Sequence, residues 1–123
     1  MAAISYSAPL ADPGTLAFAV NFCIQVLGGY GIKSIYLIGS RANGQPRSNS
    51  DHDILVILDD AAPADISLSG TLHSKIFLQL DKARKAQGLG PIDLITMRES
   101  RYQNSKDDPS AFAGAVSGGI RLF

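Results

Sequence analysis

Three short apolar runs, the last two of which are separated by a segment with helical spacing, constrain the fold of this 123-residue chain more than any other feature. The runs cover residues 34–38, 53–58 and 92–96, and glycine, proline or polar residues bound each of them. The second run is almost continuously apolar, which is typical of a strand that is covered on both faces. We therefore expect an α/β (α+β) fold, in which helices pack against a mixed sheet of three or four strands.

Helical signals precede the first run, lie between the second and the third, and follow the third. Residues 39–50, between the first two runs, are rich in Gly, Ser, Asn and Pro and predict a polar loop. Asp12 followed by Pro13 predicts the start of a helix, and the glycines after Leu27 predict its end. Further helices are expected over residues 72–86, over 98–106 and from Pro109 to the glycines at 118 and 119, and a short edge strand is expected over 120–123. Residues 1–11 are expected to be a loose lead-in. Residues 12–123 are expected to form a single domain, because this length leaves no room for a second.

Composition narrows the classes of function. Eleven basic residues balance eleven acidic ones, so an extended nucleic-acid surface is not expected, although a site for one nucleotide remains open. No apolar run approaches the roughly 18 residues that span a membrane, and no basic leader precedes an apolar segment. The single cysteine, Cys23, excludes an intrachain disulfide. We expect a cytoplasmic protein without a membrane contact.

Two carboxylates stand at the entrance to the second run. In an extended chain, residues two apart point to the same face, so Asp51 and Asp53 project together and His52 projects to the opposite face. Two carboxylates this close repel each other unless they are protonated or bridged by a cation. Aspartates at a strand end are hard oxygen ligands suited to Mg²⁺, which also binds substrate phosphates.

Gly39 and Ser40, directly after the first run, supply the complementary half of such a site. A glycine there lets backbone N–H groups approach a phosphate, and the hydroxyl of Ser40 adds one donor. We place Arg41 with the nucleotide-binding residues, a surface position being the alternative. Asp93 is a polar residue inside the third run, and a buried charge is costly unless it has a function there. If the third strand lies beside the second, Asp93 completes a site for phosphoryl or nucleotidyl transfer.

At this point the chain resembles a known family. The segments Gly39-Ser40-Arg41-Ala42, Ser50-Asp51-His52-Asp53 and Ile92-Asp93-Leu94-Ile95 are similar to the signature of minimal nucleotidyltransferases, in the DNA polymerase beta superfamily. The spacing matches the form found in stand-alone minimal enzymes and in antitoxins that are paired with helical HEPN-domain toxins. The resemblance covers roughly residues 12–123 and implies the nucleotidyltransferase fold.

The resemblance also implies roles for the site residues. Gly39 and Ser40 would hold the phosphates of ATP or another nucleoside triphosphate. Asp51 and Asp53 would coordinate two Mg²⁺ ions, and Asp93 would hold one ion and assist deprotonation of the attacking hydroxyl. The reaction would be in-line attack on the α-phosphate with release of pyrophosphate. Many relatives have a Glu-Gly pair ahead of Leu-Tyr where this chain has residues 117–119 and 122–123, and we expect that departure to affect packing or substrate contacts.

The acceptor of the nucleotide is the open question. Our first hypothesis is transfer of AMP from ATP to a hydroxyl on a helical HEPN-type partner, with this chain as the antitoxin. The second is modification of a small molecule, with a separate helical subunit as the substrate binder. The third is a non-catalytic antitoxin module that inhibits its partner by contact. The low charged fraction, 18% against roughly 25% in typical domains, favours a partner surface, and a homo-oligomer also remains open.

Overall fold

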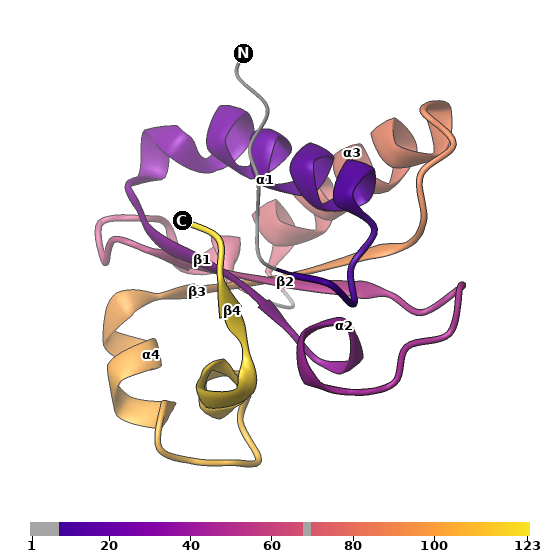
Figure 1. Cartoon of the computed structure of the whole chain (residues 1–123). Helices are drawn as coiled ribbons and strands as arrows, with labels where there is room; N and C mark the ends of the chain where they lie inside the picture. Colours follow the sequence, from indigo (N-terminus) through magenta and orange to yellow (C-terminus); the bar gives the residue numbers. More distant parts are fainter. Residues whose placement is uncertain (1–7, 68–69) are drawn as a thin grey trace.

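The computed structural model describes residues 8–67 and 70–123, which form one mixed sheet with helices on both faces (Figure 1). The helices are α1 (Pro13–Leu27), α2 (Ser40–Asn43), α3 (Thr71–Ala86) and α4 (Glu99–Ser105), and the strands are β1 (Ile32–Ile38), β2 (His52–Leu58), β3 (Ile92–Arg98) and β4 (Ile120–Arg121). Three 3₁₀ segments, η1 (Gly28–Tyr30), η2 (Ala64–Ile66) and η3 (Phe112–Gly118), connect them. No helix of this described part of the chain is long and apolar enough to cross a membrane.

The strand order of the sheet is β3-β2-β1-β4. β1 runs antiparallel to both β2 and β4, whereas β2 and β3 are parallel and are joined through α3. The end of β1 and the beginnings of β2 and β3 therefore lie at the same end of the sheet, where Figure 1 also places α2. This arrangement confirms the predicted α+β fold with a mixed sheet.

The two faces of the sheet bury two separate apolar clusters. On one face, α1 and α3 cover alternate strand residues such as Leu37, Ile54 and Leu94, all fully buried. On the other face, α4 and η3 cover the intervening residues, among them Leu55 and Ile95. The side-chain alternation of a strand thus assigns every residue of β2 and β3 to one layer or the other.

The beginning of α1 follows its sequence signal closely. Oδ2 of Asp12 accepts hydrogen bonds from the backbone N–H of Thr15 at 2.9 Å and from its hydroxyl at 2.6 Å. Pro13 occupies the first helical position, as predicted. The buried side of the helix includes Cys23, whose burial raises the pKa of its thiol to about 12.

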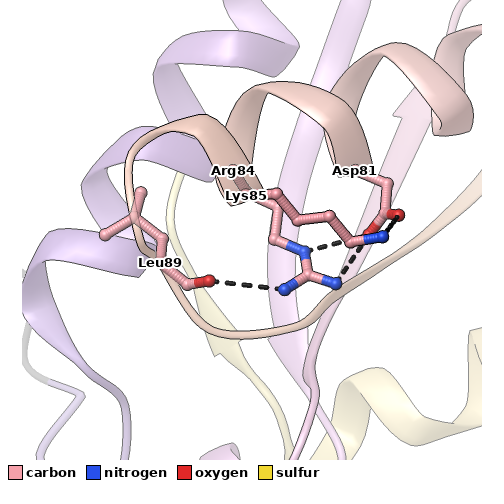
Figure 2. Close-up of polar contacts among 4 residues, drawn as sticks. All are labelled: Asp81, Arg84, Lys85 and Leu89. Carbon is pink, nitrogen blue, oxygen red and sulfur yellow. Dashed lines mark hydrogen bonds and ion pairs between the residues drawn. The ribbon is translucent and has the colours of Figure 1, made fainter.

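Charged side chains secure the end of α3 before the turn into β3. Asp81 forms ion pairs with Arg84 at 2.8 Å and with Lys85 at 3.0 Å, and Arg84 also donates to the carbonyl of Leu89 at 3.4 Å (Figure 2). Arg84 therefore joins the last turn of the helix to the segment that follows it.

Two expectations are corrected by the structure. Of the predicted lead-in, residues 1–7 lie outside the described residues, but Ala8 and Ala11 are buried in the core, so this part is not loose. The predicted helix from Pro109 is instead a turn followed by η3. Asp108 accepts hydrogen bonds from both the N–H and the hydroxyl of Ser110, which forms a local turn, and the glycines of the segment disfavour an α-helix.

The helix cap gives a first prediction. Replacing Asp12 with Ala removes both hydrogen bonds to Thr15, and we expect it to lower the free energy of unfolding by about 1 kcal/mol. Asp12→Asn should retain most of that stability. Chemical denaturation followed by circular dichroism measures the difference. Asp107→Ala, at an exposed position, is the control, and an equal loss in both Ala variants would contradict the role of the cap.

Candidate functional site

The pairing of β2 with β3 places two carboxylates side by side. The parallel register sets Asp53 opposite Asp93, and the antiparallel register of β1 sets Ile38 opposite Asp53. Asp53 and Asp93 each stand two residues before a member of the cluster under α4 and η3, so both belong to that face. The sequence prediction required β3 to lie beside β2, and the structure has that arrangement.

The environment of these carboxylates makes ionisation unfavourable. Burial, together with the nearby charges of Asp93 and Asp51, raises the pKa of Asp53 to about 6. Burial and the charge of Asp51 also raise the pKa of Asp93, although His73 and a backbone hydrogen bond from Leu94 offset part of the effect. A bound cation would relieve the repulsion among these three carboxylates, which stand at the same end of the strands.

The donor set fits a hard divalent cation that keeps other ligands. Asp51 lies just before β2 and is exposed, while Asp53 and Asp93 are half-buried. Within residues 8–67 and 70–123, no three His, Cys, Asp or Glu side chains are grouped closely enough to enclose a metal by themselves. Mg²⁺ suits such an open set, because it binds one or two carboxylates and completes its shell with water and substrate phosphates.

The turn after β1 lies directly against this carboxylate row. Gly39 has a φ of 77°, in the left-handed region that favours glycine, and a methyl group built on it would overlap Oδ2 of Asp53. α2 begins at the next residue, Ser40, and Asn43 at its end donates to the carbonyl of Gly118 at 3.0 Å. The backbone at Gly39 and Ser40 is thus held beside Asp53 with no side chain between them.

Arg41 is directed toward the backbone of other segments. Its guanidinium donates to the carbonyls of Leu10, Arg47, Ser48 and Ser50 at 3.0 to 3.3 Å. Each of the three guanidinium nitrogens takes part in these bonds. The predicted contact between Arg41 and a phosphate therefore competes with an arrangement that already uses the side chain.

His52 points away from the carboxylates, as the alternation of the strand predicts. It is buried, and its Nε2 accepts a hydrogen bond from the backbone N–H of Asp12 at 3.0 Å. Burial and the charge of Arg41 lower the pKa of His52, which favours the neutral ring. Because Nε2 accepts, the proton of the neutral ring resides on Nδ1, which is buried without a hydrogen-bond partner in the described part of the chain. His52 thereby connects the start of α1 to the strand that carries Asp53.

His73 is a residue near the site that sequence reasoning misplaced. We expected it on the polar face of its helix, but it is buried and its Nε2 lies 2.8 Å from the carbonyl oxygen of Leu94, the neighbour of Asp93. Its ring also stacks on Phe77. The spacing of His73 with Ile76 and Leu80 is that of one helix face, and this signal would have identified it as buried.

The fold, together with the three aspartates and the Gly39 turn at one end of the strands, is that of one class of protein, the nucleotidyltransferases. The sequence model of the family described as "Polymerase beta, Nucleotidyltransferase" matches residues 21–105, which is more than half of the chain. The chain belongs to this family, and it is a nucleotidyltransferase.

Solved structures are similar in fold. A crystal structure of a mutant of the toxin–antitoxin pair MntA–HpeT is similar with a TM-score of 0.52 and 19% identity, over 88% of this chain and 71% of that one. A crystal structure of a toxin–antitoxin with AMP-PNP has a TM-score of 0.49 and 23% identity, over 84% of this chain and 71% of that one. No curated protein matches the chain.

The close approach of Gly39 to Asp53 gives a second prediction. Gly39→Ala adds both backbone strain and a methyl group that displaces the Asp53 carboxylate, so we expect Mn²⁺, as a metal probe, to bind at least about tenfold more weakly. Gly88→Ala is the matched control, because Gly88 also has a positive φ of 67° but nothing within 4 Å of an added methyl. That control should lose about 1 kcal/mol of stability and bind Mn²⁺ normally. Equal Mn²⁺ affinity in the two variants would refute the steric argument.

The raised pKa of Asp53 gives a third prediction. A carboxyl whose pKa is about 6 in the folded protein and 3.8 otherwise destabilises the fold as pH rises from about 4 to about 6. In the presence of a chelator, Asp53→Asn should therefore be more stable than the wild type at pH 8 and similar to it near pH 4. Because Asp53 is half-buried, solvent screening limits the gain at pH 8 to about 1 kcal/mol. Denaturation curves at both pH values test this, and a gain that does not change with pH would contradict it.

Proposed function

We propose that this nucleotidyltransferase transfers AMP from ATP to a hydroxyl group on a helical HEPN-type partner protein, and that it acts as the antitoxin of that pair. The observation that carries the proposal is the register of β2 and β3, which sets Asp53 beside Asp93 while Gly39 leaves the backbone free to approach them. This arrangement combines carboxylates that could bind a metal with a glycine turn at the same end of the strands. Those are the parts that nucleotidyl transfer requires.

Separate groups of residues would bind the triphosphate and the metal ions. Gly39 and Ser40 would bind and orient the triphosphate through backbone N–H groups and the Ser40 hydroxyl. Asp51, Asp53 and Asp93 would hold two Mg²⁺ ions, which when bound neutralise charge on the triphosphate. The acceptor oxygen forms a bond to the α-phosphorus as the bond to the β-phosphate oxygen breaks, and pyrophosphate leaves.

Asp93 is the residue we propose to accept the proton of the attacking hydroxyl. Carboxylates are common general bases, and that of Asp93 is half-buried at the strand end where the acceptor hydroxyl would meet the α-phosphate. Asp93 also lies beside Asp53 in the parallel register, so the proposed base and a proposed Mg²⁺ ligand occupy the same level of the sheet. This placement supports a site in which the proton acceptor would lie close to the bound phosphates.

A protein acceptor is supported by the similar solved structure. That structure is a toxin–antitoxin pair, and the likeness extends over 88% of this chain. The low charge content of the sequence also favours a surface that a partner covers. A small-molecule acceptor held by a separate helical subunit is the competing outcome of the experiment below.

The test, our fourth prediction, is transfer of label to a helical partner protein, which the proposal expects a neighbouring reading frame to encode. With Mg²⁺ and ATP labelled at the α-phosphate, label should appear on that protein, whereas ATP labelled at the γ-phosphate should give none. Replacing Asp51 and Asp53 together with Ala should reduce the rate by at least about a hundredfold. Asp65→Ala with Asp107→Ala is the matched control, because it removes the same charge at exposed positions and should leave the rate unchanged.

Three outcomes would overturn the proposal. Transfer of the γ-label would make the reaction a phosphorylation. Label that goes to a small molecule in the presence of both proteins would favour the competing acceptor. If the variant without Asp51 and Asp53 carboxylates still neutralised the partner, binding alone would account for the biological effect.

A further inference from the structure

The side chain of Arg41 binds two separate segments of the backbone. Nη1 donates to the carbonyl of Leu10 at 3.2 Å, and Nη2 donates to those of Arg47, Ser48 and Ser50 at 3.0, 3.2 and 3.2 Å. Nε donates to the carbonyl of Ser50 as well, at 3.3 Å. One cation thus satisfies four carbonyl oxygens that belong to the N-terminal segment and to the polar loop.

The loop that Arg41 holds has few other internal bonds. Between α2 and β2 the chain has no helix or strand, and most of its residues are exposed. Ser50 donates its N–H to the carbonyl of Arg47 at 3.0 Å, and its hydroxyl accepts from the N–H of Arg47 at 2.8 Å. These two bonds form a small turn, and the guanidinium binds the carbonyls that this turn presents.

The residue that follows this loop is Asp51. Asp53 and Asp93 are fixed by the strand ladder, but Asp51 precedes β2 and has no partner in the register of that ladder. The peptide that joins Ser50 to Asp51 carries the carbonyl bound by both Nε and Nη2 of Arg41. The Asp51 backbone is therefore held on one side by the guanidinium and on the other by the N–H of His52, which donates to the carbonyl of Pro91 at 3.0 Å.

We propose that Arg41 is a positioning residue, which orders the loop from Arg47 to Ser50 and so fixes Asp51 against Asp53. The functional importance of Asp51 rests on the proposed function, whereas the ordering of the loop by Arg41 does not depend on it. Arg41 follows Ser40 directly, so the same residue joins the phosphate-binding turn to the loop that ends at Asp51. The two halves of the site are held in one relative position.

A lysine could not take over this role. The guanidinium is planar and presents N–H groups in several fixed directions, which suits carbonyls that come from different segments. The ammonium of Lys has three donors on a single nitrogen and could not reach Leu10 and the loop in the same way. Arg41→Lys therefore keeps the charge while it removes the bridging geometry.

The experiment, our fifth prediction, compares Arg41→Lys with Arg47→Lys. Arg47 is exposed, and only its backbone takes part in the bonds described for the loop. Amide hydrogen exchange is measured without metal or nucleotide, and the rates at residues 47–51 are expressed relative to the amides of Leu55 and Ile95 in the same sample. Arg41→Lys should speed exchange at Ser50 by about tenfold or more, while Arg47→Lys should resemble the wild type.

Two binding measurements distinguish positioning from direct contact with a phosphate. Arg41→Lys should bind Mn²⁺ more weakly, and its affinity for ATP in the absence of metal should stay unchanged. A loss of ATP affinity with normal exchange at Ser50 would overturn the proposal in favour of a phosphate contact. Faster exchange with normal Mn²⁺ affinity would overturn the link to Asp51. The exchange result stands whether or not the chain transfers AMP, so failure of the proposed function would be recognised separately.

Discussion

The parallel pairing of β2 with β3 is the constraint on which the rest of the site depends. It sets Asp53 and Asp93 at the same level on adjacent strands, and the alternation of the strand directs both to the same face. Neighbouring strands are held about 4.8 Å apart by their hydrogen bonds, so the backbones of the two aspartates cannot separate without breaking the ladder. Burial raises the pKa of both carboxyls, and repulsion adds to it, from Asp93 and Asp51 at Asp53 and from Asp51 at Asp93.

This repulsion is tolerated because packing on the opposite face stabilises the same strands. Ile54 and Leu94, each one residue after a carboxylate, are fully buried under α1 and α3. Burying a side chain of this size contributes roughly 1.5–3 kcal/mol, which exceeds what a half-buried carboxylate costs after solvent screening. The apolar layer thus stabilises the pairing of β2 with β3 against the cost of placing Asp53 and Asp93 side by side.

The sequence was sufficient for most of the fold and for the row of acidic residues. Apolar runs and the signals at Asp12 and Pro13 predicted the main elements, because burial and helix capping depend directly on the type of side chain at each position. The position of Asp93 beside Asp53 followed once β3 was taken as the neighbour of β2. The described structure differs mainly at η3, where glycines and a local Asp108 turn replace the predicted helix.

The contacts that the sequence could not predict are those between side chains and backbone. Arg41 binds four carbonyls, His52 accepts an N–H and His73 contacts the carbonyl of Leu94. Every residue has the same carbonyl, so the partner in such a contact leaves no mark in the sequence. Only the three-dimensional path of the chain decides which carbonyl lies within reach, and this is why Arg41 was assigned from its motif to a phosphate.

The separation of the two faces has a practical consequence for handling the protein. Leu78 on α3 is 66% exposed, and α3 covers the face opposite to that of Asp53 and Asp93. A cysteine introduced at Leu78 would be a suitable attachment point for a dye or a solid support, because the native Cys23 is completely buried and its thiol is protonated. Molecules tethered there would present the carboxylate face to the solution in a uniform orientation.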